Sequence, residues 1–157
     1  MSHVATVQVE IKDLDCLEAA AKRCGLVFKR DQKEFKWYGR WMNDYAEDDA
    51  AYKALGIDPK DYGKCIHAIG IEGDKSAYEI GIVNNPKGGY ALLWDFYAGG
   101  HGLMKHVHAD SEKTRSGIGK LQQAYAIEVA KKNARKQGFS VSEKQQKDGS
   151  IKLVCTR

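Results

Sequence analysis

Two stretches with helical periodicity, each ended by a glycine that leads into strand-like residues, constrain the fold more than any other feature. In each stretch, apolar residues spaced by three or four positions make one stripe. The first stripe is Leu14, Leu17, Ala21 and Cys24, and the second is Ile118, Leu121, Tyr125 and Val129. Asp13 or Asp15 is suited to cap the first helix, and Gly25 and Gly138 are suited to end the two helices. The pattern predicts two main helices.

Short alternating or apolar segments around these helices predict strands. They cover residues 4–11, 26–29, 34–38, 65–71, 77–83, 90–96, 139–144 and 151–155. The expected order is β-α-β-β, an insert, and β-α-β-β again. We predict an α+β fold in which two pseudo-duplicated β-α-β-β units form an antiparallel sheet with the two main helices on one face. Residues 40–63 are the expected insertion or flap within a single domain spanning residues 1–157.

Composition excludes several classes of protein. No apolar run approaches about 18 residues, so the sequence predicts no membrane-spanning helix and no membrane partner. The first residues lack a basic segment followed by an apolar stretch, which favours a cytoplasmic location. The four cysteines, Cys16, Cys24, Cys65 and Cys155, lack paired spacing. We therefore expect reduced thiols rather than disulfides or a zinc knuckle.

Charge is unevenly distributed along the chain. The formal net charge is +4, but residues 101–157 hold twelve Lys and Arg against five acids, whereas residues 43–61 hold six acids against two lysines. A basic C-terminal third is suited to anionic ligands such as nucleotides, phosphates or RNA. The competing interpretation is a solvated helix end, because the cations among residues 131–136 lie where the second helix stops and offset its dipole.

Four segments of the chain carry a family resemblance. They are VATVQVEIKDLDCLEAAAKRCG, AYEIGIV, YALLWDFY and LQQAYAIEVAKKNARKQGFSVSEKQQKDGSIKLVCTR. Through them the chain resembles the domain of unknown function 1257, whose members occur in cyanobacteria, red-algal plastids and tailed phages. The resemblance implies a small soluble α+β protein, with no family-wide reaction and no catalytic residues to carry over. Residues 40–62 depart from the compact family pattern, and residues 99–114 do so less clearly.

Three histidines, His101, His106 and His108, lie within eight residues and precede Asp110. Imidazoles at this spacing, with one more ligand, suit zinc or iron, and a histidine also suits general acid–base catalysis. Neither an HExxH helix nor a regular Cys/His spacing accompanies them. The glycines at 99, 100 and 102 favour the competing interpretation, a polar loop. We therefore expect no cofactor, with zinc or iron at these histidines as the alternative.

Aromatic and basic residues gather on and beside the expected hairpin at residues 26–38. The candidate ligand-binding residues there are Lys29, Lys36, Trp37, Tyr38, Arg40 and Trp41. Aromatic rings with nearby cations can stack on a base and neutralise its phosphate. In the competing interpretation Trp37 belongs to the core and the cations are solvated, because one strand face must supply the core.

A second candidate group lies where the strand at residues 90–96 ends. Trp94 and Tyr97 flank Asp95 ahead of Gly99 and Gly100, which suits the wall of a pocket, so both aromatic residues are candidate ligand-binding residues. Residues 117–120, Gly-Ile-Gly-Lys, precede the second helix, where backbone amides can bind an anion. They lack the spacing of a nucleotide-hydrolysing phosphate loop.

These features favour a binding protein over an enzyme. We predict a non-enzymatic protein for an anionic ligand, either a nucleotide-like small molecule or a nucleic acid; a phage member would sequester a host signalling nucleotide in the host cytoplasm. One alternative is a metal-dependent enzyme that uses residues 101–110. Another is a protein–protein adaptor that docks through a sheet edge or residues 40–63, since aromatic residues are favoured in interfaces. Free sheet edges also predict a homo-oligomer.

Overall fold

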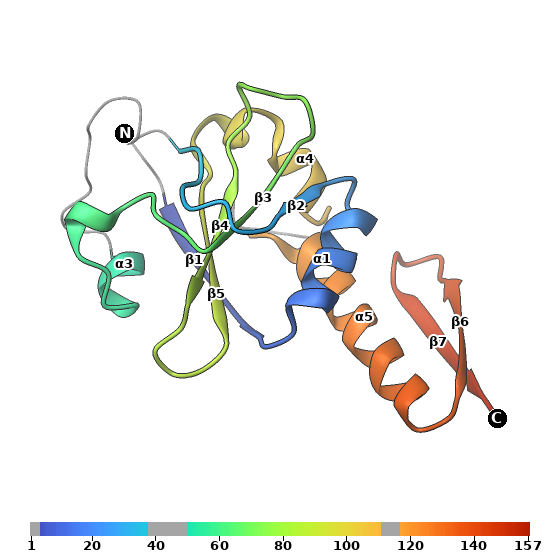
Figure 1. Cartoon of the computed structure of the whole chain (residues 1–157). Helices are drawn as coiled ribbons and strands as arrows, with labels where there is room; N and C mark the ends of the chain where they lie inside the picture. Colours follow the sequence, from blue (N-terminus) through green and yellow to red (C-terminus); the bar gives the residue numbers. More distant parts are fainter. Residues whose placement is uncertain (1–3, 38–49, 111–116) are drawn as a thin grey trace.

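A curled five-stranded antiparallel sheet organises the computed structural model of the protein, which describes residues 4–37, 50–110 and 117–157 (Figure 1). The strand order is β1-β5-β4-β3-β2. The strands are β1 (Val4–Ile11), β2 (Val27–Lys29), β3 (His67–Gly70), β4 (Ile80–Asn84), β5 (Tyr90–Asp95), β6 (Ser140–Gln145) and β7 (Ile151–Thr156). The helices are α1 (Leu14–Arg23), α3 (Ala50–Ala54), η1 (Pro59–Asp61), η2 (Tyr97–Gly102), α4 (Met104–Val107) and α5 (Gly119–Lys136). The predicted α+β class and the antiparallel sheet are confirmed.

The two main helices cover one face of the sheet, as predicted. Side chains alternate between the two faces along each strand. Those on the face covered by the helices pack with α1 and α5 in one apolar cluster. The members from strands β3, β4 and β5 are Ile69, Ile80, Ile82, Leu92 and Trp94. Asp13 caps α1 by accepting a hydrogen bond from the Cys16 amide at 3.0 Å. The cap and the apolar stripe together fix where α1 begins and which side it buries.

Residues between β2 and β3 cover the other face. Phe35, Trp37, Tyr52, Leu55 and Tyr62 are buried there against Ala68, Val83, Ala91 and Leu93. The described part of the expected flap, residues 50–63, thus supplies three core side chains, whereas residues 40–49 lie outside the described residues. Both faces of the sheet are therefore buried.

The strand predicted at residues 34–38 is reduced to a single bridge between Glu34 and Lys64. Successive backbone amides of this segment donate to different acceptors. The Phe35 amide donates to the Gly63 carbonyl, and the Lys36 amide donates to the Glu79 side chain. A regular ladder cannot form when a side chain takes one of its donors. Tyr38, the last residue of that predicted strand, lies outside the described residues.

The C-terminal strands differ from the predicted duplication. β6 and β7 form a separate two-stranded sheet that lies beside α5, so the two expected β-α-β-β units do not share one sheet (Figure 1). The sequence of β6, SVSEKQ, has one apolar residue and cannot supply a buried strand face. Within the residues described, no helix is long and apolar enough to cross a membrane.

Replacing Gly81 with alanine is expected to lower the free energy of unfolding by about 1–3 kcal/mol, the usual range for overpacking. A Cβ atom at this position would lie 2.3 Å from Cδ1 of Phe35, which covers the strand. The measurement is urea unfolding of four proteins: wild type, Gly81→Ala, Phe35→Leu and the double variant. The cost of Gly81→Ala should shrink in the Phe35→Leu background. An equal cost in both backgrounds would contradict this steric explanation.

Candidate functional site

The aromatic residues predicted to bind a ligand separate into core and surface. Trp37 and Trp94 are 1% and 0% exposed, so their rings belong to the two clusters that cover the faces of the sheet. Tyr97 is 38% exposed. Tyr38, Arg40 and Trp41 lie outside the described residues. The structure therefore does not bring the described aromatic candidates together on one surface.

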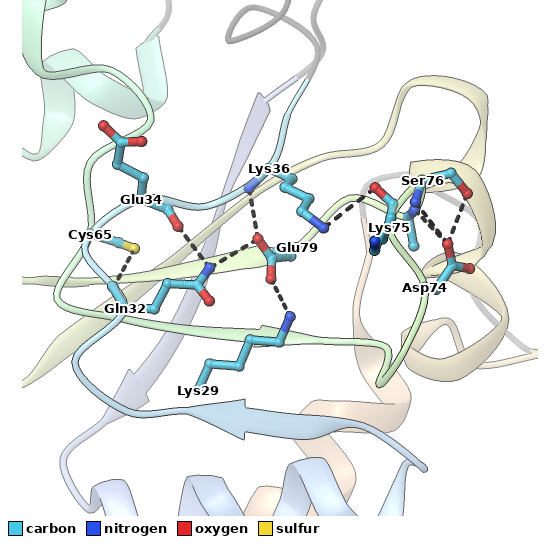
Figure 2. Close-up of polar contacts among 10 residues, drawn as sticks. Lys29, Gln32, Glu34, Lys36, Cys65, Asp74, Lys75, Ser76 and Glu79 are labelled. Carbon is cyan, nitrogen blue, oxygen red and sulfur yellow. Dashed lines mark hydrogen bonds and ion pairs between the residues drawn. The ribbon is translucent and has the colours of Figure 1, made fainter.

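The basic candidates of this group surround a buried carboxylate, Glu79, whose residue is 2% exposed (Figure 2). Lys29 Nζ donates to Glu79 Oε2 at 2.7 Å. The Lys36 amide and Gln32 Nε2 each donate to Glu79 Oε1 at 3.0 Å. Lys36 Nζ extends the other way and donates to the Lys75 carbonyl at 3.4 Å. Both lysine side chains thus contact other groups of the protein, and the Glu79 carboxylate accepts three hydrogen bonds.

Cys65 lies beside this cluster and donates from Sγ to the Gln32 carbonyl at 3.1 Å (Figure 2). Burial raises the pKa of the Cys65 thiol to about 12, and the negative charges of Glu79 and Glu34 add to the effect. Because the thiolate is the reactive form, a thiol with this pKa is inert at neutral pH. The hydrogen bonds of Glu79 hold Lys29, Gln32 and the Lys36 amide beside the start of β4.

The three candidate metal ligands have separate roles. His106 Nδ1 is 2.9 Å from the Cys24 carbonyl, which joins α4 to the end of α1. His108 Nδ1 is 3.2 Å from the Gly117 carbonyl, which joins the end of α4 to the start of α5. His101 instead contacts the ring of Tyr78, with the centroids 4.7 Å apart. Among the described residues no group of three His, Cys, Asp or Glu side chains is placed to hold a metal ion.

Four consecutive residues before α4, Ala98 to His101, adopt left-handed backbone conformations. The φ angles of Ala98 and His101 are 48° and 51°, in a region that costs a residue with a side chain roughly 1–2 kcal/mol. The Gly100 carbonyl accepts from the Tyr78 amide at 2.9 Å, and Asp95 Oδ1 accepts from the Tyr97 amide at 2.9 Å. These bonds hold the turn that directs the chain from β5 into α4.

A cleft of about 820 Å³ lies beside α4. Its walls come from the end of α1, from α4 and the residues after it, from the first turns of α5, and from the turn between β6 and β7. The lining includes Arg23, Cys24, Lys105, His108, Asp110, Lys120, Gln123, Gln145 and residues 148–151. The two histidine contacts described above hold three of these walls together. The volume lies in the range of small-molecule sites.

Positive charge dominates the helical side of this cleft. Burial raises the pKa of the Cys24 thiol, and the nearby charges of Lys120 and Arg23 act in the opposite direction. Among the described residues, no ion pair engages Lys105 or Lys120. Residues 117–120 lead into α5, so the positive end of a helix of 18 residues faces the same region. Asp110 and Asp148 are the acidic lining residues, and the Asp148 carboxylate accepts from the Ser150 amide and hydroxyl within its own turn.

Ion pairs hold the hairpin of β6 and β7 against the helices. Arg23 makes two hydrogen bonds to the Glu143 carboxylate, at 2.8 and 3.0 Å. Lys131 Nζ donates to the same carboxylate at 2.8 Å. These hydrogen bonds, first from Arg23 and then from Lys131, lower the pKa of Glu143 to about 2. The outer wall of the cleft is therefore attached in part through a charged contact, beside the half-buried Val141, Ile151 and Leu153 on the same face of the hairpin.

Sequence reasoning recognised the anion-binding potential of residues 117–120 but not the cleft. Arg23, Lys105 and Ser150 are far apart in the sequence, and no local pattern indicates that they line one cavity. The excess of positive charge in residues 101–157 was the sequence feature that could have indicated a basic site in this part of the chain.

The family model of a protein of unknown function, DUF1257, matches residues 63–154, which is more than half of the chain. The chain belongs to the DUF1257 family. The match in this DUF1257 protein covers β3 to β6 and most of β7, including α4, α5 and most of the cleft lining. No curated protein and no solved structure matches the chain.

Substituting Glu79 with alanine is expected to lower the free energy of unfolding of the DUF1257 protein by about 2–3 kcal/mol. The Lys36 amide and the Gln32 side chain lose their acceptor, whereas Lys29, with a side chain that is 29% exposed, can regain water. Guanidinium unfolding followed by tryptophan fluorescence measures the change. Glu72→Ala is the control, because this exposed residue should alter stability by no more than about 0.5 kcal/mol. Equal stabilities of the two variants would contradict the role given to Glu79.

Acidification is expected to loosen the hairpin. The pKa of Glu143 lies below its ordinary value of 4.5, so the contact contributes fully above about pH 4.5 and is lost as the pH falls toward about 2. Hydrogen exchange of the β6 amides, corrected for intrinsic rates, should accelerate over this range. Glu143→Gln removes the titrating group and should abolish this pH-dependent component while other carboxylates still titrate. Identical pH profiles for both proteins would contradict the assignment.

Proposed function

We propose that the protein binds an anionic small molecule, of nucleotide type, in the cleft between α1, α4, α5 and the hairpin turn, without converting it chemically. The main support for this proposal is the pair of exposed lysines, Lys105 and Lys120, which line one cleft at the start of α5. Ammonium groups and helix-terminal amides are both suited to phosphate oxygens. Their meeting in one cavity supports a phosphate group as the part of the ligand held there.

The rest of the lining supports a ligand larger than inorganic phosphate. Gln123 and Gln145 provide amide donors and acceptors, and Asp110 provides a carboxylate. A nucleotide carries donors and acceptors on its sugar and base that such groups can bind. The volume of about 820 Å³ also exceeds what one phosphate requires.

Binding without turnover is favoured by the state of the thiol in the cleft. Cys24 lines the cavity, but burial raises its pKa, so the thiolate needed for nucleophilic attack is scarce at neutral pH. A sequestering protein needs affinity and a slow release, not a nucleophile. We expect it to act in the cytoplasm, and a phage-encoded copy would withhold a host signalling nucleotide.

Calorimetric titration with a panel of mono-, di- and cyclic nucleotides at low salt tests this function. We expect one member of the panel to bind, and the Lys105→Ala/Lys120→Ala variant to bind it at least about tenfold more weakly, since a hydrogen bond to a charged group contributes about 1.5–3 kcal/mol. Lys60→Ala/Lys87→Ala removes the same charge outside the cleft lining and serves as the control. Absence of binding by wild type, or equal losses in both variants, would refute the proposal.

A further inference from the structure

The hairpin of β6 and β7 has an inner face and an outer face. Glu143 contacts Arg23 and Lys131, and Gln145 and Ile151 line the cleft, so these residues define the inner face. Because side chains alternate along a strand, the neighbouring positions point away from the helices. In register, the outer pairs are Ser140 with Thr156, Ser142 with Val154, and Lys144 with Lys152. All of these except Val154 are exposed.

The pairing of Lys144 with Lys152 is unfavourable for the hairpin by itself. Like charges directly opposite each other on two strands destabilise the pairing. In the part of the chain that the structure describes, neither lysine makes an ion pair. By contrast, the inner face neutralises its charges, since Glu143 pairs with Arg23 and Lys131. The outer face thus concentrates the positive charge of two lysines that make no ion pair among the described residues.

The side chains on the outer face of the hairpin are suited to bind the phosphate backbone of a nucleic acid. Lysine ammonium groups together with the hydroxyls of Ser140, Ser142 and Thr156 are the groups that usually bind phosphate oxygens. No aromatic residue occupies an outer position of the two strands, so the bases of a single strand would find no ring to stack on. Phe139, which precedes β6, is covered by the guanidinium of Arg157 at 4.6 Å from its centroid. These features favour a duplex.

The shape of the hairpin further selects DNA over RNA. A two-stranded ribbon fits the major groove of B-form DNA, whereas the major groove of A-form RNA is too narrow for it. The hairpin lies at one end of the molecule, beside α5 and away from the five-stranded sheet (Figure 1). We propose that the outer face of the β6–β7 hairpin, centred on Lys144 and Lys152, enters the major groove of duplex DNA, where the lysines contact the phosphates at the edges of the groove. This surface is separate from the cleft and does not depend on the proposed nucleotide function.

Fluorescence anisotropy with a short labelled DNA duplex tests the docking surface. Affinity of the wild type should fall as salt rises from about 50 to about 200 mM, because phosphate contacts release counterions. Lys144→Gln/Lys152→Gln should bind about tenfold more weakly at the lower salt and reduce the slope of log K against log salt by about 2. The matched control, Lys60→Gln/Lys87→Gln, has the same net charge and alters two exposed lysines in other elements. It should retain the wild-type slope.

Four results would overturn the proposal. They are no binding of the duplex by wild type at low salt, equal loss in both double variants, tighter binding of single-stranded DNA, and tighter binding of duplex RNA. A loss of DNA binding that is caused by misfolding can be recognised by thermal unfolding. Because removing the lysine pair relieves repulsion, the melting temperature of the variant should match or exceed that of wild type. The nucleotide titration distinguishes the two proposals, since Lys144→Gln/Lys152→Gln leaves Lys105 and Lys120 unchanged. Nucleotide affinity should therefore stay at the wild-type value.

Discussion

The carboxylate of Glu79 is the contact on which the arrangement around the sheet depends. It accepts hydrogen bonds from Lys29, from Gln32 and from the Lys36 amide. It thereby helps to fix a segment whose described residues pair with the rest of the chain through one isolated bridge, between Glu34 and Lys64. Phe35 and Trp37 lie in and next to this segment, and both are buried against the face opposite the main helices. A buried carboxylate is unfavourable unless its hydrogen bonds are satisfied. Here the same bonds that satisfy it also position the aromatic cover of the sheet.

Other elements cover both faces of the sheet, and among the described residues neither apolar cluster includes a residue of the C-terminal hairpin. The hairpin is held instead by the contacts of Glu143 with Arg23 and Lys131, at the surface between α1 and α5. This charged attachment leaves space beside the start of α5, and the turn of the hairpin closes that space into the cleft. Ion pairs near the surface contribute less than buried apolar contacts. The cleft wall is therefore less firmly held than the sheet, which is compatible with the ligand binding that we propose for the cleft.

The parts of the fold that follow local rules could be predicted from the sequence. The stripe of α1, its Asp13 cap and the antiparallel strands β4 and β5 agree with the residue pattern, because periodicity and capping act over a few positions. The sequence leaves the burial of Trp37 open, since a ring beside cations is compatible with a core or with a binding surface, whereas Trp94, expected in a pocket wall, is buried in the core. The separate hairpin and the cleft could not be predicted, because they depend on contacts between residues more than 100 positions apart, such as Arg23 and Glu143.

The lysines of the C-terminal third differ in whether they make ion pairs in the structure. Lys131 and Lys132 are paired with Glu143 and Asp13, so they stabilise contacts between elements. Lys105 and Lys120 in the cleft, and Lys144 and Lys152 on the hairpin, make no ion pair among the described residues. Affinity for phosphate depends on the cations that a ligand can reach and on the counterions that it displaces, not on net charge. A chain with a net charge of only +4 can therefore carry two separate pairs of lysines without ion-pair partners among the described residues, because acids such as Asp13 and Glu143 pair with other cations.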